Sequence, residues 1–268
     1  MVALTDLIEC FRDTRRRYST EPELCDRTLR AMAGTRLYLS AFEAVLRPVK
    51  SESSDIEVTP DTTFSAARKL IAPGARVAVL NFANAYSPGG GVTRGAMAQE
   101  ECLCRSSNLY ACLTLPYLTR NYYKHNSRTT GDLGTDAVIY SSGVTVFKTD
   151  DALPLPMDDW FEVDVLTCAA PYNNPDRKKP FSDEELEAAF EGRVRNILEV
   201  AVCEGADRLV LGAFGCGAFN NPPELVAGVF RRLLKEEGYR RYFKDVVFAV
   251  KPGGNHNFEV FRDALCSG

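Results

Sequence analysis

Two glycine-rich loops, each placed between a predicted strand and a predicted helix, constrain the fold of this chain more than any other feature. The first loop, 89–91, follows the apolar stretch 76–83 and precedes a helical stretch that begins at Gln99. The second loop, 212–220, has the same setting later in the chain. Because glycine lacks a Cβ, such loops can turn their N–H groups toward a ligand and approach it closely. Parallel strands end at one edge of a sheet, so we expect the loops to face each other there and bind a diphosphate.

The order of predicted elements after residue 76 is that of an α/β protein. The stretch 76–83 is apolar nearly throughout, which is typical of a central strand covered on both faces. We therefore expect a three-layer sandwich, with helices on both sides of a mixed, mostly parallel sheet. The predicted strands are 35–39, 55–58, 76–83, 136–140, 144–147, 161–168, 207–212 and 245–250, and the predicted helices include 2–18, 98–113, 115–124 and 256–265.

Local signals place several boundaries. Asp61 is the predicted N-cap of a helix that runs to Ile71, and Ser182 with Glu185 has the spacing of a capping box. Pro222 is expected at the first position of another helix. The strands 136–140 and 144–147 are predicted to form a hairpin. We predict that residues 1–60 form an N-terminal helical extension packed on the core and that residues 61–268 form the catalytic domain.

Composition excludes several classes of protein. The 268 residues carry a formal net charge of −4, which argues against long-range attraction to nucleic acid or to an anionic membrane. No apolar run approaches the length of a membrane span. The nine cysteines show no C-x-x-C spacing, which is typical of reduced thiols in an intracellular protein. Only His125 and His256 are present, so a histidine-based metal site is not expected.

Two adjacent glutamates, Glu100 and Glu101, stand at the start of the helix that follows the first glycine loop. A pair of carboxyl groups beside a phosphate site suggests acid–base chemistry, because like charge raises the pKa of a carboxyl group. The alternative is a solvated helix N-terminus, where the helix dipole favours acidic residues. A Rossmann motif is not cleanly met, and the P-loop motif G-x-x-x-x-G-K-[ST] does not occur.

Taken together, these motifs resemble those of the microbial-type poly(ADP-ribose) glycohydrolases, which have a macrodomain fold. The family signature is three glycines, six to eight residues, and then Gln-Glu-Glu. Here seven residues separate Gly91 from Gln99-Glu100-Glu101. The resemblance extends over most of residues 20–265 and includes Asn81-Phe-Ala-Asn84, Arg105-Ser-Ser-Asn-Leu-Tyr110, Leu166-Thr-Cys-Ala-Ala-Pro171 and Gly215-Cys-Gly-Ala-Phe219.

The resemblance implies a role for each matching residue. Glu101 corresponds to the catalytic acid, and Glu100 to the neighbour that helps to hold the substrate ribose. Asn84 corresponds to the asparagine near the terminal ribose, and Phe219 to the aromatic side chain that packs on bound ADP-ribose. The further residues implied in substrate binding are Gly89, Gly90, Gly91, Val92, Gln99, Gly215, Cys216, Gly217 and Ala218. No cofactor and no metal are implied.

The resemblance also implies the activity. Members hydrolyse the ribose–ribose O-glycosidic bond, which needs an acid for the leaving hydroxyl group. We expect an exo-acting, monomeric, intracellular enzyme, cytoplasmic or nuclear, that binds poly(ADP-ribose) or ADP-ribosylated proteins, releases ADP-ribose and serves the DNA damage response. Two alternatives stay open: a hydrolase of mono-ADP-ribosylated protein or nucleic acid, and a macrodomain that binds ADP-ribose without cleaving it. No membrane or sequence-specific nucleic acid is expected as a partner.

Two positions depart from the family pattern. Members often carry Gly-Asn-Asp-Pro after the aromatic residue of the second loop, whereas this chain has Asn220-Asn221-Pro222-Pro223. Asparagine tolerates the left-handed conformation, so we expect Asn220 to replace the glycine. Tyr172 follows Pro171 where asparagine is common. Both changes are expected near the rim of the ligand site, where they could shift the preference among substrates.

Overall fold

The centre of the protein is a mixed sheet of seven strands in the order β1-β4-β5-β3-β6-β7-β2. A computed structural model describes residues 4–39, 49, 55–129, 131–176, 178–253 and 255–266. Neighbouring strands among β5, β3, β6, β7 and β2 are parallel, whereas β4 runs antiparallel to β1 and β5. The strands are β1 Arg36–Tyr38, β2 Ile56–Thr59, β3 Val77–Phe82, β4 Val138–Val146, β5 Phe161–Cys168, β6 Arg208–Leu211 and β7 Asp245–Ala249. The predicted mixed, mostly parallel sheet is confirmed.

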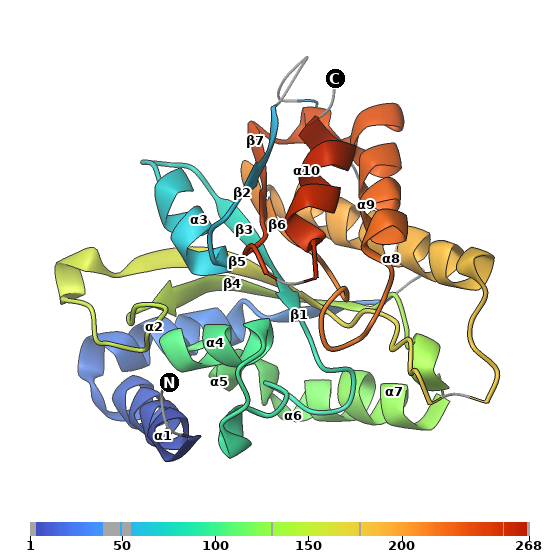
Figure 1. Cartoon of the computed structure of the whole chain (residues 1–268). Helices are drawn as coiled ribbons and strands as arrows, with labels where there is room; N and C mark the ends of the chain where they lie inside the picture. Colours follow the sequence, from blue (N-terminus) through green and yellow to red (C-terminus); the bar gives the residue numbers. More distant parts are fainter. Residues whose placement is uncertain are drawn as a thin grey trace.

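Helices cover both faces of this sheet (Figure 1). The α-helices are α1 Leu4–Thr20, α2 Pro22–Ala33, α3 Thr63–Leu70, α4 Gln99–Ser106, α5 Leu109–Leu113, α6 Pro116–Leu118, α7 Lys124–Thr129, α8 Asp183–Glu204, α9 Pro223–Arg231 and α10 Asn257–Cys266. Short helical turns are η1 Val92–Arg94, η2 Thr119–Tyr123, η3 Gly131–Leu133, η4 Met157–Asp159, η5 Arg232–Glu236 and η6 Tyr239–Tyr242. The helices α8, α9 and α10 pack on one face, and α1 to α6 pack on the other.

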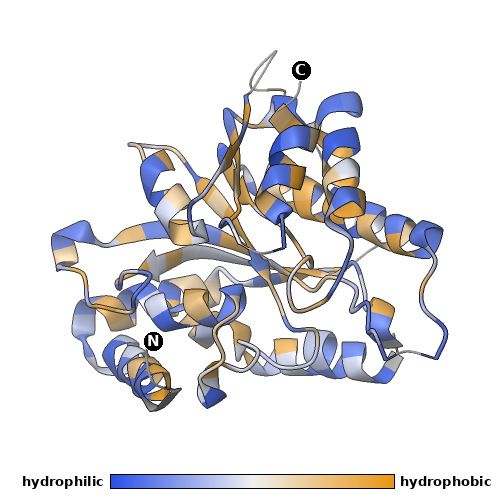
Figure 2. Cartoon of the chain, in the orientation of Figure 1, coloured by the Kyte–Doolittle hydropathy of each residue, from blue (hydrophilic) through white to orange (hydrophobic). Residues whose placement is uncertain are grey.

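Strand β3 shows why the sheet is covered on both sides. Its residues Ala78 and Leu80 lie in the core beneath α8 and α9, whereas Val77 and Val79 lie in the core beneath α3 and α4. This alternation follows from the two-residue period of a strand, and it explains the continuous apolar sequence. In Figure 2, apolar residues are frequent in the strands, and hydrophilic residues are frequent on the outer sides of the helices.

The hairpin predicted from residues 136–147 is wrong. The two predicted strands form one strand, β4, whose pairing with β5 shifts register between Ser141 and Val144. Such an irregularity places an extra residue in one strand without ending it. Gly143 has a φ of +63°, and its N–H donates a 3.0 Å hydrogen bond to Asp164 of β5. The glycine that suggested a turn therefore marks a bulge.

Several helix boundaries also differ from the predictions. Thr62, not Asp61, is the N-cap of α3, because its hydroxyl accepts a hydrogen bond from the Ser65 N–H. Pro223, not Pro222, occupies the first turn of α9. The predicted helix 98–113 is divided into α4 and α5. The capping box of Ser182 and Glu185 is confirmed.

The N-terminal segment contributes more than the predicted helix 2–18. It contains a second helix, α2, and the strands β1 and β2, which form the two edges of the sheet. Residues 1–3, 40–48 and 50–54 of the predicted extension lie outside the described residues. A boundary between an extension and a catalytic domain near residue 60 stays a prediction.

Candidate active site

The two glycine loops follow neighbouring strands of the sheet. Strands β3 and β6 are parallel neighbours, with Val79 opposite Val210, so both loops leave the same edge of the sheet. The rings of Phe82, at the end of β3, and Phe214, in the second loop, are 5.8 Å apart. A Cβ added to Gly212 would lie 2.8 Å from the Phe82 ring, so only glycine fits this close approach. The expectation that both loops follow neighbouring strands at one edge of the sheet is confirmed, whereas the facing of loop 89–91 toward the second loop stays a prediction.

Gln99 fixes the start of α4 against β3. Its Oε1 accepts a 2.9 Å hydrogen bond from the Phe82 N–H, and its Nε2 donates to the Leu80 carbonyl at 2.8 Å and to Thr63 Oγ1 at 3.0 Å. The side-chain amide thus continues the strand's own hydrogen-bonding pattern. These bonds determine where the next two residues of the helix, Glu100 and Glu101, can point.

The Glu101 side chain lies beneath the first glycine loop and is only 7% exposed. Its Oε1 accepts a 2.7 Å hydrogen bond from the Gly91 N–H. Its Oε2 is buried and has no hydrogen-bond partner among the described residues. Gly90 has a φ of +56°, and a Cβ there would lie 2.4 Å from Glu101 Oε1. The loop can therefore close over this carboxyl group only because position 90 is glycine.

The neighbouring Glu100 is more deeply buried and is held by asparagines. Its Oε2 accepts a 2.8 Å hydrogen bond from the Asn84 N–H, and its Oε1 accepts a 3.4 Å contact from Asn81 Nδ2. Burial, and then repulsion from Glu101, raises the pKa of Glu100 to about 8, against the opposing effect of these hydrogen bonds. Glu100 is therefore mostly protonated at neutral pH. The two adjacent glutamates occupy different environments, one bound by main-chain and side-chain amides, the other beneath the loop.

The two glycine loops use their N–H groups differently. In the first loop the N–H of Gly90 donates to the Ser87 carbonyl at 3.0 Å, and that of Gly91 donates to Glu101. In the second loop the N–H groups of Gly217, Ala218 and Phe219 meet no acceptor among the described residues. The second loop thus fits the expectation of a phosphate-binding backbone. Phosphate binding by Gly89, Gly90 and Gly91 stays a prediction and would require exchange of existing hydrogen bonds.

The second loop is held in shape by asparagines. Asn221, which is 3% exposed, donates from Nδ2 to the Pro171 carbonyl at 2.8 Å and to the Gly215 carbonyl at 2.9 Å. Asn220 has a φ of +56°, so it replaces the expected glycine as predicted. Gly215 has a φ of +76°, and a Cβ there would lie 2.6 Å from Ala170 Cβ.

A cavity of about 560 Å³ opens along the second loop. Of the residues predicted to bind substrate, Gln99, Gly215, Gly217, Ala218 and Phe219 line it. A second cavity of about 200 Å³ adjoins it and is lined by Asn84, Ala218 and Phe219 among others.

The remaining predicted residues line neither cavity; they are Gly89, Gly90, Gly91, Val92, Glu100, Glu101 and Cys216. Val92 is fully buried in the core, and Cys216 is buried, which raises its thiol pKa to about 12. Their contact with substrate stays a prediction.

Many residues of the larger cavity have no counterpart among the predicted site residues, and Asn257 is one of them. Asn257, at the start of α10, is 6% exposed and lines the larger cavity, yet its side chain has no hydrogen-bond partner among the described residues. It follows the segment Lys251-Pro252-Gly253 at the end of β7, a third strand–loop–helix connection at the same sheet edge. Its position after β7 could have identified Asn257 from the sequence, because ligands of open α/β sheets bind at the carboxyl ends of the strands.

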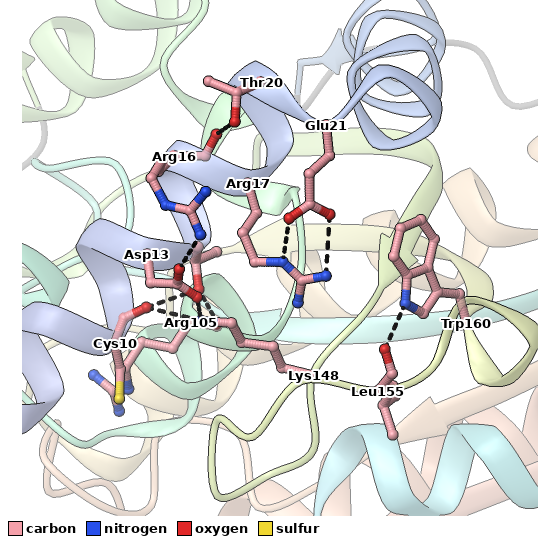
Figure 3. Close-up of polar contacts among 11 residues, drawn as sticks. Cys10, Asp13, Arg16, Arg17, Thr20, Glu21, Arg105, Lys148, Leu155 and Trp160 are labelled. Carbon is pink, nitrogen blue, oxygen red and sulfur yellow. Dashed lines mark hydrogen bonds and ion pairs between the residues drawn. The ribbon is translucent and has the colours of Figure 1, made fainter.

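The N-terminal helix α1 packs against α4, the helix that carries Glu100 and Glu101. Figure 3 shows Lys148 reaching α1, where its Nζ donates to the Cys10 carbonyl at 3.0 Å and pairs with Asp13 at 2.9 Å. In the same region Thr14 donates to the carbonyl of Arg105 in α4. The Phe11 and Tyr110 rings meet edge to face with centroids 4.9 Å apart. The Tyr110 ring in turn lies within 2.8 Å of where a Cβ on Gly89 would be.

The described residues show no metal site and no membrane helix. No group of three or more His, Cys, Asp or Glu side chains among them is arranged to hold a metal ion. None of the helices in the described part of the chain is both long enough and apolar enough to cross a membrane.

Comparisons with known proteins agree with the geometry. A family model described as "Microbial-type PARG, catalytic domain" matches residues 12–149. The crystal structure of poly(ADP-ribose) glycohydrolase (PARG) from Thermomonospora curvata is similar with a TM-score of 0.86 and 36% identity, over 97% of this chain and 99% of that chain. The structure of the same enzyme bound to the inhibitor ADP-HPD is similar with a TM-score of 0.82 and 38% identity, over 96% of this chain and 98% of that chain. The structure of PARG from Deinococcus radiodurans in complex with ADP-ribose is similar with a TM-score of 0.77 and 36% identity, over 89% of this chain and 96% of that chain. No curated protein matches.

The expected fold and the expected family are both confirmed by these matches. This chain belongs to the microbial-type poly(ADP-ribose) glycohydrolase family.

Proposed function

We propose that this protein hydrolyses the ribose–ribose O-glycosidic bonds of poly(ADP-ribose) and releases ADP-ribose from chain ends, with Glu101 as the general acid and base. The observation that carries the proposal is the position of the Glu101 carboxyl group, whose Oε1 is bound by the Gly91 N–H while its Oε2 is buried without a partner. An unsatisfied carboxyl oxygen in a shielded site is costly for stability alone. The position of Glu101 between Gln99 and Cys102, which both line the larger cavity, favours a catalytic role.

The reaction can be written with the residues present. The protonated Glu101 carboxyl group gives its proton to the bridging oxygen, the C1–O bond of the distal ribose breaks, and positive charge develops on the ring. The resulting Glu101 carboxylate then takes a proton from water as the water oxygen bonds to C1, which restores the acid. We assign the ribose hydroxyl groups to Glu100 and Asn84, which are joined by a hydrogen bond. The raised pKa of Glu100 keeps it largely protonated at neutral pH.

The remaining parts of the ligand are assigned by chemistry. The free N–H groups of the second loop suit a diphosphate, because main-chain amides bind phosphate oxygens without needing a basic side chain. The larger cavity, about 560 Å³, then takes the adenosine half, with Phe219 against the ligand and Asn257 near the base. We further propose a monomer that works inside the cell, and the nine free cysteines support a reducing compartment.

The test is a comparison of substrates. The purified protein is incubated with poly(ADP-ribose) and with mono-ADP-ribosylated protein, and the release of ADP-ribose is measured. Release from the polymer alone supports the proposal. Release from the mono-modified protein alone would indicate the mono-ADP-ribosyl hydrolase, and tight ADP-ribose binding with no release would indicate a binding module.

A further inference from the structure

The smaller cavity is linked to the glutamate pair through Asn84. It measures about 200 Å³ and shares the wall formed by Ala170, Ala218 and Phe219 with the larger cavity. The Asn84 N–H is bonded to Glu100, while the residue itself lines the smaller cavity. Asn84 therefore contacts both a carboxyl group of the pair and this space.

The size of the smaller cavity indicates what it can hold. Pockets for whole ligands of drug size measure roughly 300–1,000 Å³, a range that includes the larger cavity but not the smaller. A volume of about 200 Å³ suits a single ring system. The adenosine half of the released unit is assigned to the larger cavity, and its terminal ribose to the Asn84 side of the smaller one. The rest of the smaller cavity is then left for the group on the other side of the broken bond.

Three of the nine residues that line the smaller cavity are aromatic. Tyr86, Tyr172 and Phe219 line it, and the rings of Tyr172 and Phe219 are 5.7 Å apart in an edge-to-face arrangement. None of the described residues that line it is a lysine or an arginine, so it offers no counter-charge to phosphate. Aromatic side chains without cations are typical of a surface that stacks a base.

These aromatic residues are held in place. The Tyr86 hydroxyl donates to the Gly131 carbonyl at 3.1 Å, and the Tyr172 N–H donates to the Asp132 carbonyl at 2.7 Å. The segment between residues 131 and 136 that accepts these bonds is itself fixed by Arg193 of α8, which is 1% exposed and donates from Nε to the Thr135 carbonyl at 2.9 Å. The two tyrosines therefore need little ordering when a ligand binds, which favours binding.

We propose that the smaller cavity is a leaving-group subsite that stacks the adenine of the preceding ADP-ribose unit on Tyr86 and Tyr172. The inference rests on the proposed hydrolysis of poly(ADP-ribose). In the polymer, the oxygen that leaves belongs to the ribose that carries this adenine, so the base lies close to the broken bond. The subsite recognises the polymer, because an amino-acid leaving group brings no purine to the two rings.

The test compares two substrates that share the ADP-ribose unit and differ in the leaving group. One is poly(ADP-ribose), and the other is ADP-ribose with fluoride at the anomeric carbon, which has no base to stack. For Tyr86→Ala and Tyr172→Ala we expect kcat/KM on the polymer to fall about tenfold more than on the fluoride, because stacking is worth about 1–3 kcal/mol per base. The Kd of ADP-ribose is measured in parallel.

Two further variants serve as controls. Tyr86→Phe keeps the ring and should retain most of the polymer activity. Tyr117→Ala removes a tyrosine of similar exposure, 39% against 43% for Tyr86, and should leave both substrates unchanged. If kcat/KM falls equally on the polymer and on the fluoride and ADP-ribose binds as much more weakly, the tyrosines belong to the site of the released unit and the inference is overturned. An unchanged kcat/KM on the polymer would overturn it too. A wild-type protein that hydrolyses the fluoride but not the polymer would instead refute the proposed function.

Discussion

The Gly91 N–H and the Glu101 carboxyl group are joined by a hydrogen bond of 2.7 Å, across ten residues of sequence. This bond links the first glycine loop to the first turn of α4, so the loop's position and the direction of the carboxyl group depend on each other. The three glycines thus serve to enclose an acid. In the second loop, by contrast, main-chain N–H groups are left open to a ligand.

Replacing Gly90 with alanine should disrupt this arrangement. The new Cβ would lie 2.4 Å from Glu101 Oε1, and the φ of +56° is unfavourable for alanine. We expect hydrolysis of poly(ADP-ribose) to fall on the order of 100-fold, because misplacement of a catalytic group by about 1 Å has effects of this size. Gly74→Ala is the matched control: Gly74 has a φ of +73° but open space around it, so this variant should lose stability and keep its activity. Equal activity of the two variants would show that Gly90 does not position Glu101.

The ionisation of Glu100 should make the stability of the protein depend on pH. The pKa of Glu100 is about 8 in the folded protein and 4.5 without the surrounding structure, so between these values the folded state binds more protons than the unfolded state. The contribution of Glu100 to the free energy of unfolding is therefore fully present below about pH 4.5 and is lost as the pH rises through about 8. We expect the free energy of unfolding of Glu100→Gln, relative to wild type, to improve by a few kcal/mol between pH 5 and pH 9, since each pKa unit is worth about 1.4 kcal/mol. Urea unfolding at these two pH values measures this, and a constant difference between the two proteins would contradict it.

In the ion pair between Asp13 and Lys148, removing the aspartate should destabilise the protein more than removing the lysine. Lys148 is buried and faces Asp13 and the Cys10 carbonyl, and although burial opposes it, the hydrogen bonds from Lys148 and Arg16 hold the pKa of Asp13 below its usual value. Asp13→Ala leaves a buried charge with one carbonyl partner, so we expect a loss of about 1–3 kcal/mol in the free energy of unfolding. Lys148→Met, which removes the buried charge, should cost less. Arg12→Ala, which breaks an exposed pair with Glu9, is the control and should change stability by less than about 1 kcal/mol.

Asn257→Ala should weaken ligand binding without destabilising the fold. The side chain has no hydrogen-bond partner in the described part of the protein, so its removal leaves no protein group unsatisfied. A hydrogen bond to the adenosine half is worth about 0.5–1.5 kcal/mol, so we expect the Kd of ADP-ribose to rise about 2- to 10-fold. Asn255→Ala, in the exposed loop nearby, should leave the Kd unchanged. Calorimetry measures the affinity, and a loss of melting temperature without a change in Kd would point to a structural role.

The features predicted well from sequence are those that depend on local patterns. The apolar stretch 76–83 identified β3, and the glycine runs after β3 and β6 located the two loops, because parallel strands must end at the same edge. The capping box at Ser182 was equally local. Gly143 was misread because a bulge and a turn both need a glycine, and only the partner strand distinguishes them.

The features that sequence did not predict depend on contacts between distant segments. The residues that fix α4, such as Gln99 with Leu80, are brought together by the sheet, and nothing in their local sequence shows the pairing. The position of Asn257 after β7 could have suggested a ligand contact. That its side-chain amide is unpaired and faces a cavity becomes evident only from the structure. The different use of main-chain N–H groups in the two loops depends on φ and ψ values that the glycines permit but do not specify.

The rate at which Glu101→Gln hydrolyses poly(ADP-ribose) tests the central claim most directly. Glutamine keeps the size of the side chain and can accept the Gly91 hydrogen bond, but it cannot supply or take up the proton. We predict a loss on the order of 100-fold or more in kcat, with the Kd of ADP-ribose nearly unchanged. A variant that retains the wild-type rate would contradict the assignment of Glu101 as the general acid and base.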